Sequence, residues 1–382
     1  MERDQAIRFI HELLRKMVEV KGSDLFLTAG FPPAIKVDGR VKPVNDQPLT
    51  PQQSATLVRS IMNDRQTKEF DASKECNFAI SPPRIGRFRV SAFIQQGHSG
   101  AVMRTINTKI PTFEELELPP VLKDVAMTKR GLVLVVGGTG SGKSTTLAAM
   151  VGYRNDNSKG HIITIEDPVE YVHTHKNCVV TQREIGIDTE GWHVALKNTL
   201  RQAPDVILIG EIRARETMDY AVAFAETGHL CLATLHANNA NQTLDRIINF
   251  FPEAAREQVL VDLSLNLRAV VSQRLLPCVQ GGRIPAVEVL LSTPYVRSQI
   301  ERGEIAALKD AMKQDSGSGM QTFDEALFQL YDAGRVTYAD IMQAADSRTD
   351  LALKVRLRDA AQRSGDSLAL DSLTATEAEG QG

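Results

Sequence analysis

Glycines, a lysine and a serine stand at the spacing of a phosphate-binding loop between residues 137 and 144. The eight residues, GGTGSGKS, match the pattern G-x-x-x-x-G-K-[ST] at every fixed position. Glycines let backbone N–H groups turn toward a phosphate, and the start of the following helix adds the positive end of its dipole. We expect Lys143 to reach the β- and γ-phosphates and the Ser144 hydroxyl to bind Mg²⁺. The pattern predicts that a nucleoside triphosphate is bound by Gly137, Gly138, Thr139, Gly140, Ser141, Gly142, Lys143, Ser144 and Thr145.

Two glutamates follow apolar runs that are typical of buried strands. Glu166 ends the run HIITIE, and Glu211 comes directly after DVILIG. A carboxylate at position 166 could orient and deprotonate an attacking water. Glu211 resembles a Walker B terminus and would hold Mg²⁺ through water or share the role of base. Either glutamate alone could be a solvated loop acid, but two carboxylates beside a triphosphate need a metal.

Two histidines flank the strand expected at 230–234. A lone histidine is more often structural than catalytic, and for His229 both interpretations stay open. His236 follows soon after Thr234 at the end of the strand, and we expect it to sense the γ-phosphate.

The elements that position these residues are apolar runs of strand length that alternate with helices. They lie at 132–136, 161–166, 205–210 and 230–234. This order predicts a parallel sheet, whose carboxyl ends bring the polar residues to one nucleotide. The rest of the domain is expected to be helical except for a short strand at 286–291. The expected helices cover 241–249, 253–274, 294–301, 304–313, 322–332 and 337–345.

The N-terminal region shows a different order of elements, typical of an α+β domain. An amphipathic helix is expected at 3–20 and a second helix at 51–70. Asp38 and Gly39 between alternating runs predict a β-hairpin within 33–44. Further strands are expected at 23–28, 76–80, 86–95 and 100–106.

The sequence divides into four parts. We expect the α+β domain to cover 1–108 and a proline-containing linker to cover 109–120. The nucleotide-binding domain with its C-terminal helices then covers 121–345. Residues 346–382 form a C-terminal extension, and its acidic end, without aromatic or basic residues from 364 on, predicts disorder from about that residue.

Composition limits the kinds of partner. The formal net charge is −3, which gives no electrostatic reason to expect nucleic acid as a partner. The four cysteines are far apart and form no CxxC pair, which argues against a structural zinc site and fits a reducing compartment. No apolar run approaches the ~20 residues of a membrane span, and the N-terminus lacks the apolar core of a signal peptide. We therefore expect a cytoplasmic protein without a membrane span.

Three runs resemble the signature motifs of the secretion ATPases, which drive type II secretion, type IV pili and related machines. IITIEDPVEYVH (162–173), ILIGEIRARET (207–217) and TGHLCLATLHANNA (227–240) resemble their Asp box, Walker B and His box. The resemblance continues at 22–41, 86–93 and 319–327. In detail the chain resembles the type IV pilus retraction ATPases (PilT/PilU type), and its acidic C-terminal extension brings it nearest to the PilU-type accessory retraction ATPases. The lack of a tetracysteine zinc motif departs from the extension and secretion branches.

The resemblance implies an α/β fold in which a PAS-like N-terminal domain is joined to a RecA-like P-loop ATPase domain with a helical C-terminal part. It implies a homo-hexamer that binds ATP and Mg²⁺. It also implies a role for each site residue. Glu166 would be the catalytic glutamate, Glu211 the Walker B acid, His229 and His236 the His-box pair, and Arg89 and Arg104 the arginines that reach the γ-phosphate.

The function implied is that of a hexameric ATPase motor that powers type IV pilus retraction and twitching motility. It would act with a paralogous main retraction ATPase, on an inner-membrane platform protein, at the cytoplasmic base of the pilus. The alternative is a regulatory or scaffold ring that binds ATP and reinforces another motor. A nucleic-acid motor would need a basic channel, and the acidic balance argues against it.

Overall fold

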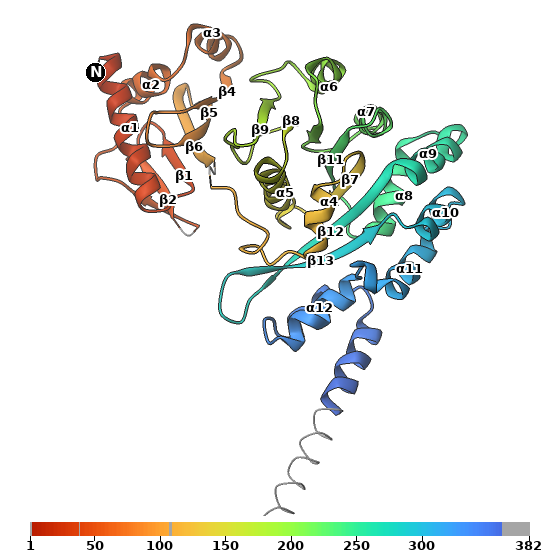
Figure 1. The fold of residues 1–382 in the computed structure, drawn as a ribbon. Helices are drawn as coiled ribbons and strands as arrows, with labels where there is room; N and C mark the ends of the chain where they lie inside the picture. The colour runs from red at the N-terminus through yellow and green to blue at the C-terminus, as the bar shows by residue number, and fades with distance from the viewer. Residues whose placement is uncertain (1, 38, 107–108, 361–382) are drawn as a thin grey trace, which may run out of the picture. The chain divides into compact units, whose positions relative to one another are not determined.

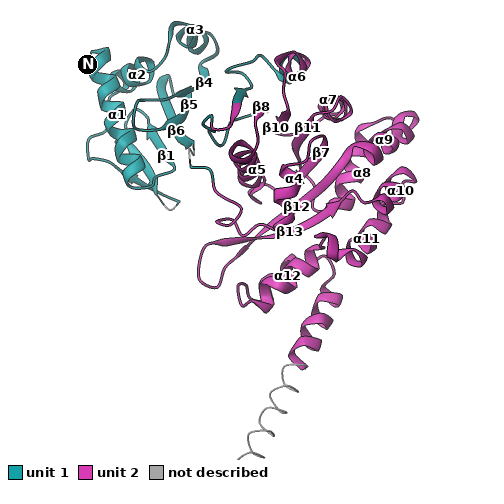
Figure 2. Cartoon of the chain, in the orientation of Figure 1, with its two compact units in different colours: residues 1–110, 165–175, 180–195 teal, residues 111–164, 176–179, 196–382 magenta. Residues whose placement is uncertain are grey.

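Apolar residues at helical spacing fold the start of the chain into α1 (Arg3–Glu19). Ile10, Leu14 and Met17 lie on one face of this helix and are fully buried. The computed structural model describes residues 2–37, 39–106 and 109–360, and the chain separates into two units (Figure 2). Unit 1 comprises residues 1–110, 165–175 and 180–195, and unit 2 comprises the rest.

Unit 1 contains a six-stranded antiparallel sheet in the order β3-β2-β1-β6-β5-β4. Its strands are β1 (Asp24–Leu27), β2 (Ala34–Val37), β3 (Arg40–Pro43), β4 (Glu75–Ile80), β5 (Arg87–Gln95) and β6 (His98–Ile106). The predicted hairpin is confirmed by the pairing of β2 with β3, although its residue Asp38 lies outside the described residues. Two further helices, α2 (Pro51–Ser60) and α3 (Asp64–Ser73), complete this part.

The predicted helix at 51–70 is two helices. Asn63 caps the start of α3, because its side chain accepts a hydrogen bond from the backbone N–H of Gln66 and the Gln66 side chain accepts one from the Asn63 N–H. This second N-terminus interrupts the helix between residues 60 and 64.

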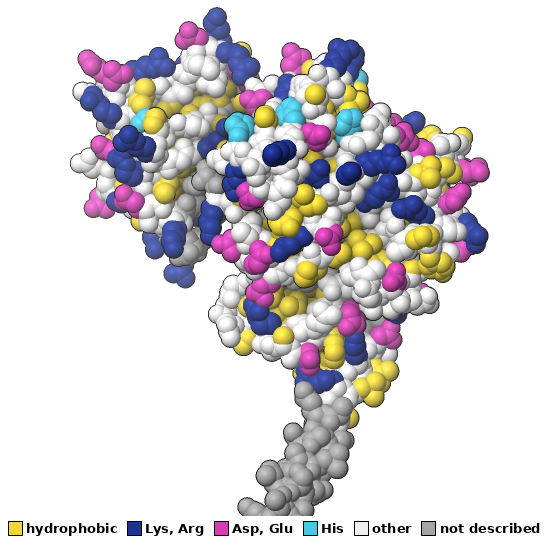
Figure 3. All heavy atoms as spheres, in the orientation of Figure 1, with side chains coloured by type: hydrophobic (Ala, Val, Ile, Leu, Met, Phe, Trp, Pro, Cys, Tyr) yellow, Lys and Arg dark blue, Asp and Glu magenta, His cyan; other side chains and the backbone are white. Residues whose placement is uncertain are grey.

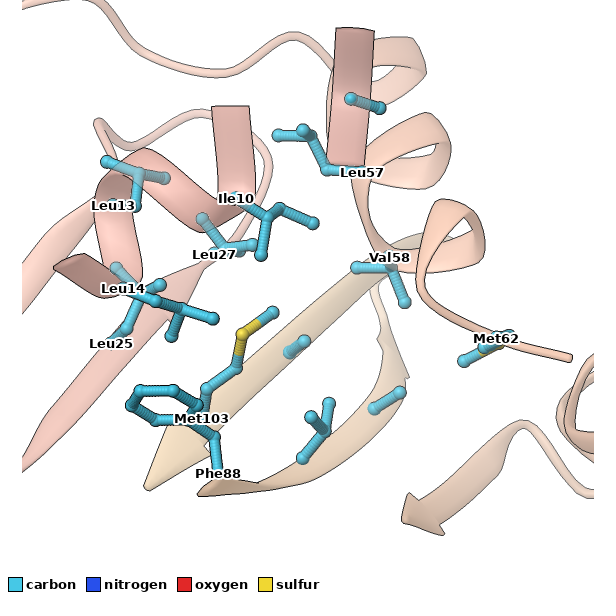
Figure 4. Close-up of a cluster of buried hydrophobic side chains, with 14 of the residues drawn as sticks. Ile10, Leu13, Leu14, Leu25, Leu27, Leu57, Val58, Met62, Phe88 and Met103 are labelled. Carbon is cyan, nitrogen blue, oxygen red and sulfur yellow. The ribbon is translucent and has the colours of Figure 1, made fainter. Parts of the chain in front are cut away.

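The core of this unit lies between the helices and one face of the sheet (Figure 4). Ile10 and Leu14 of α1 and Leu57 of α2 lie close to Phe88 and Met103 of the sheet. Phe88 and Met103 are 0% exposed. Since successive side chains of a strand point to opposite faces, their neighbours Arg87, Arg89 and Arg104 lie on the other face of the sheet.

The second sheet has the order β13-β12-β7-β11-β10-β8-β9. Its strands are β7 (Gly131–Val136), β8 (Gly160–Glu166), β9 (Cys178–Glu184), β10 (Val206–Ile209), β11 (Leu230–Leu235), β12 (Leu267–Pro277) and β13 (Arg283–Leu291). β7 lies between β11 and β12 and is parallel to both, and β10 is parallel to β11. β13 pairs antiparallel with β12 (Figure 1). The predicted α/β fold is confirmed.

The helices of this part alternate with the strands and then follow them. They are α4 (Val121–Ala126), α5 (Lys143–Asn157), α6 (Trp192–Thr199), α7 (Arg215–Glu226), α8 (Ala240–Phe250), α9 (Glu253–Asn266), α10 (Pro294–Glu301), α11 (Leu308–Gln314), α12 (Phe323–Asp332) and α13 (Tyr338–Ala344). Short 3₁₀ turns lie at Leu200–Gln202, Ile305–Ala307 and Ser316–Ser318. A last helix covers 348–360. None of the described helices is long and apolar enough to cross a bilayer.

The prediction of one helix over 253–274 is wrong from residue 267 on. β12 hydrogen-bonds β7 on one side and β13 on the other. Val270 and Val271 are β-branched and 0% exposed between these neighbours, which favours a strand over a helix. Tertiary pairing overrides the apparent continuation of α9.

Two predictions about the ends of domains stay predictions. The boundary at residue 108 falls on residues 107 and 108, and the disorder expected from about residue 364 falls within 361–382. Both segments lie outside the described residues.

We expect Phe88→Ala to lower the free energy of unfolding by about 3–5 kcal/mol, because it removes a fully buried ring and leaves a cavity. Urea unfolding followed by circular dichroism measures this. Phe31→Ala is the control, since Phe31 is 44% exposed and its truncation should cost less than about 0.5 kcal/mol. Equal losses in the two variants would contradict this description of the core.

Candidate functional site

The phosphate-loop pattern lies in the strand–loop–helix context that it requires. β7 is buried at every residue and ends at Val136, and α5 begins at Lys143. Gly142 directly precedes the helix with φ +91°, a conformation that favours glycine. Its carbonyl accepts the first helical hydrogen bond, from Thr146 N–H at 2.9 Å.

Lys143 lies back over its own loop. Its Nζ donates to the carbonyl oxygens of Gly137 and Gly138, each at 2.9 Å. Burial lowers the pKa of the Lys143 amino group, and the negative charge of Glu211 opposes this shift. A half-buried ammonium that binds only neutral carbonyls at hydrogen-bond distance among the described residues suits an anionic group such as phosphate.

The loop also holds a buried hydroxyl whose partner is missing. Ser141 is 8% exposed, and its Oγ has no hydrogen-bond partner among the described residues. An unpaired buried polar atom in a phosphate loop fits a site made for a polar ligand. Lys143, Ser141 and the loop N–H groups therefore fit a nucleotide phosphate.

A residue that sequence reasoning missed supports this loop from the neighbouring strand. Gln273 of β12 is 3% exposed, and its Oε1 accepts a hydrogen bond from Thr146 Oγ1 at 2.7 Å. No pattern in the sequence indicated a role for Gln273, because 253–274 was expected to be a helix. Only the pairing of β12 with β7 brings it beneath the loop.

Glu211 and His236 come together as expected from two adjacent strands, β10 and β11. His236 Nε2 is 3.0 Å from Glu211 Oε1, and Arg213 lies 2.7 Å from Glu211 Oε2. Desolvation alone would raise the pKa of Glu211, but Arg213, His236 and Lys143 outweigh it and hold the pKa below its usual value. Glu211 is therefore an anion at neutral pH.

A cavity of ≈ 470 Å³ lies beside these residues. Gly137 and Gly138 of the phosphate loop and His236 of the segment after β11 contribute to its wall. Its other lining residues are Ala237, Asn238, Gln242, Asp245, Arg246 and Asn249. The carboxyl ends of β7 and β11 thus share one cavity.

His229 lies at the other end of β11. It directly precedes the strand, and its carbonyl accepts a hydrogen bond from Gly131 N–H at the start of β7. The six residues of β11 lie between it and His236, which puts the two histidines about 23 Å apart at the rise of a strand. Its Nδ1 lies 3.1 Å from Thr227 Oγ1 and 3.3 Å from Phe224 O. The structure does not bring His229 to the phosphate loop.

Glu166 ends β8, as expected, and belongs to unit 1. The side-chain amide of Gln182 on β9 donates to Glu166 Oε1 at 3.3 Å and to Tyr171 O at 2.8 Å. The same amide accepts a hydrogen bond from His173 N–H at 2.7 Å. Gln182 therefore orients the Glu166 carboxylate and fixes the segment that follows it.

Arg89 and Arg104 are cross-strand partners on β5 and β6 of unit 1. Arg89 Nη2 donates to Val169 O at 3.1 Å, and its Nε lies 3.9 Å from Glu184 Oε1. Burial raises the pKa of Glu184, while Val169 N–H and Arg89 oppose this. Glu184 Oε2 also accepts from Val169 N–H at 3.1 Å.

Arg104 is held by an acid on the next strand. Its Nε donates to Asp24 Oδ1 at 2.7 Å. Desolvation opposes ionisation of Asp24, but Arg104 and Ser23 outweigh it, so the pKa of Asp24 lies below its usual value. Both arginines bind groups of their own unit in this structure.

A buried acid anchors the helix that lines the cavity. Glu288 of β13 accepts a hydrogen bond from Ala240 N–H, at the start of α8, at 2.7 Å and one from Ser272 Oγ at 3.1 Å. Burial raises the pKa of Glu288 to about 7; Asp346 adds to this shift, and Ala240, Ser272 and Arg274 oppose it.

Comparison with known proteins assigns the chain to a family. The sequence pattern of the family described as "Type II/IV secretion system protein" matches residues 2–364. The chain belongs to this family. The sequence-based assignment to the secretion ATPases is thereby confirmed.

Two relatives from Pseudomonas aeruginosa are similar over most of their length. The chain is 61% identical over 347 residues to the type IV pilus ATPase PilU, and the match covers 91% of each chain. It is 45% identical over 336 residues to the retraction ATPase PilT, and this match covers 88% of this chain and 98% of PilT. These matches confirm the resemblance to the PilT/PilU-type retraction ATPases.

A solved structure supports the predicted fold. The chain matches a crystal structure of the pilus retraction motor PilT with bound ADP with a TM-score of 0.84 and 40% identity. The match covers 89% of this chain and 98% of that one. The N-terminal domain joined to a RecA-like ATPase domain with a helical C-terminal part, predicted from the sequence, is confirmed.

We expect Glu288 to make the stability of the fold depend on pH. Because its pKa of about 7 lies above the ordinary value of 4.5, its stabilising effect is complete below pH 4.5 and is lost as the pH rises through 7. In Glu288→Gln an amide oxygen still accepts from Ala240 and Ser272, so the free energy of unfolding should fall less over this range than in the wild type.

Urea unfolding at several pH values measures this difference. Glu301→Gln, an exposed site on α10, is the control and should follow the wild type. Parallel pH curves for Glu288→Gln and the wild type would show that Glu288 does not titrate in this range.

Proposed function

We propose that the chain is an ATPase of the type IV pilus retraction machinery, which hydrolyses ATP to ADP and phosphate to power pilus disassembly and twitching motility. The observation that carries this proposal is the phosphate loop with Lys143 bent over it, beside the paired Glu211 and His236. The similarity to PilU and PilT over most of the chain supports the choice of machinery.

In this proposal the chain's own residues bind and orient the nucleotide. Lys143 exchanges the carbonyls of Gly137 and Gly138 for the β- and γ-phosphates. Ser144, exposed at the start of α5, and the anionic Glu211 would hold Mg²⁺. The metal would supply charge neutralisation on the phosphate oxygens. His236, held by Glu211, faces the cavity beside the loop and senses the γ-phosphate.

Glu166 is proposed as the general base. Its carboxylate, oriented by Gln182, accepts the proton of the attacking water. β8, which it ends, neighbours β10 in the order of the sheet, and Glu211 follows β10 closely. This order supports a shared task for the two glutamates.

Arg89 and Arg104 are proposed to reach the γ-phosphate in the assembled ring. For this Arg89 exchanges Val169 O and Glu184, and Arg104 exchanges Asp24, for phosphate oxygens. Such an exchange couples movement of the N-terminal part to hydrolysis. Because His229 lies far from the phosphate loop of its own subunit, we propose that it does not contact the phosphates bound there.

We place the chain in a homo-hexamer at the cytoplasmic base of the pilus. It works there with a paralogous retraction ATPase on an inner-membrane platform protein. Both basic and acidic side chains lie on the face in view (Figure 3), and the formal net charge of −3 gives no electrostatic reason to expect a nucleic-acid partner. The alternative is a regulatory ring that binds ATP and reinforces another motor.

Hydrolysis by the purified chain tests the proposal. We expect a hexamer that hydrolyses ATP, with kcat reduced about 10²–10⁴-fold in Glu166→Gln because the base is lost. Lys143→Ala should lose nucleotide binding as well. Phosphate release and light scattering measure activity and assembly.

Glu170→Gln is the matched control, because Glu170 is an exposed glutamate of the same segment, and it should keep wild-type activity. A wild-type ring that binds ATP but hydrolyses it no faster than Glu166→Gln would overturn the motor and favour the regulatory ring.

Twitching motility separates the two roles in the cell. In a strain that lacks this chain, the wild type should restore motility and Lys143→Ala should not, because a motor requires bound ATP. Colony spreading and pilus retraction under microscopy measure this. Full restoration by both Lys143→Ala and Glu166→Gln at wild-type protein levels would mean that ATP turnover by this chain does not drive retraction.

A further inference from the structure

One buried residue of β12 contacts both ends of the phosphate loop. A Cβ atom on Gly137, where the loop begins, would lie 2.5 Å from the backbone oxygen of Gln273. A Cβ atom on Gly142, where the loop ends, would lie 2.7 Å from its Nε2. Only glycine at both positions permits this approach. The path of the loop is thus shaped against Gln273.

The Gln273 side chain is held in one orientation. Its Oε1 accepts the hydrogen bond of Thr146 Oγ1 at 2.7 Å, and both residues are buried, at 3% and 1% exposed. With the oxygen bound to Thr146, the N–H groups of the amide face Gly142 at the turn into α5. The amide therefore connects the first turn of the helix to the end of the loop.

The strand that carries Gln273 is also fixed. Ser272 pairs with Val136, the last residue of β7, and Gln273 itself pairs with Val287 of β13. Gln273 thus projects just beyond the last paired residue of the strand that enters the loop. A shift of its amide would require a change in its side chain, since the backbone of Gln273 is paired with Val287 and that of the preceding Ser272 with Val136.

We propose that Gln273 is a positioning residue for the phosphate loop. Its amide holds the end of the loop at Gly142, where the chain turns into α5, in the shape that turns the backbone N–H groups toward nucleotide phosphates. It thereby raises affinity for the nucleotide without binding it directly. The inference rests on the proposed function, since it concerns the same nucleotide site.

The competing explanation is that Gln273 and Thr146 form a buried polar pair that only stabilises the fold. Removing one partner of such a pair leaves the other unsatisfied and lowers stability, whereas replacing both by apolar groups of similar shape is nearly neutral. Gln273→Met, Thr146→Val and the double variant therefore separate stability from positioning.

The experiment measures the affinity of the full chain for ADP with Mg²⁺ by calorimetry, and stability by urea unfolding. We expect Gln273→Met to weaken ADP binding about tenfold, in the range of one lost hydrogen bond. The double variant should regain stability but keep the weakened binding, and Thr146→Val should lose less affinity than Gln273→Met. Gln299→Met, at a buried glutamine of α10 that is 6% exposed, should bind ADP as the wild type does.

The outcomes are distinct. A double variant that regains both stability and wild-type affinity would show that the pair is purely structural and would overturn the proposal. An affinity of Gln273→Met for ADP within about twofold of the wild type would also overturn it, because the loss of one hydrogen bond weakens binding by more than that. A wild-type chain that binds no ADP would remove the proposed function itself, and the positioning role with it.

Discussion

The close approach of β12 to the phosphate loop is the constraint on which the site depends. A Cβ on Gly137 would collide with the Ser141 hydroxyl and the backbone oxygen of Gln273, and a Cβ on Gly142 would collide with the Gln273 amide. The loop is therefore not an autonomous turn of β7 into α5 but a segment shaped against a neighbouring strand. The parallel pairing of β7 with β12 positions the loop as much as its own glycines do.

The same strand extends this constraint to the C-terminal helices. Arg274, the residue after Gln273, donates to the carbonyl of Asn238 in the cavity wall and forms an ion pair with Asp346 at 2.7 Å. Glu288, on the strand paired with β12, holds the start of α8 at Ala240. The helical C-terminal part thus contributes to the shape of the cavity that lies beside the phosphate loop and His236.

The parts of the site that can be predicted depend on short sequence patterns, whereas the other parts depend on which strands pair in the sheets. The loop pattern and the apolar runs sufficed to predict that the phosphate loop and His236 lie together at the ends of β7 and β11, where Gly137, Gly138 and His236 line one cavity. Gln273 could not be predicted, because no glycine or proline separates α9 from β12 in the sequence, and the division between them depends on pairing with β7 and β13. The partners of Arg89 were equally hidden, because Glu184 lies far along the chain and only the fold brings them together.

Hydrogen–deuterium exchange of the full chain with and without Mg²⁺ and ADP tests most directly whether the loop and its neighbouring strand form one nucleotide-binding structure. We expect the nucleotide to slow exchange in peptides that cover 137–146. We also expect slower exchange around residue 273 on β12, while exchange in α1 of unit 1 stays unchanged. Protection of the loop without any change around Gln273 would contradict the dependence on β12, and no protection at the loop would contradict nucleotide binding there.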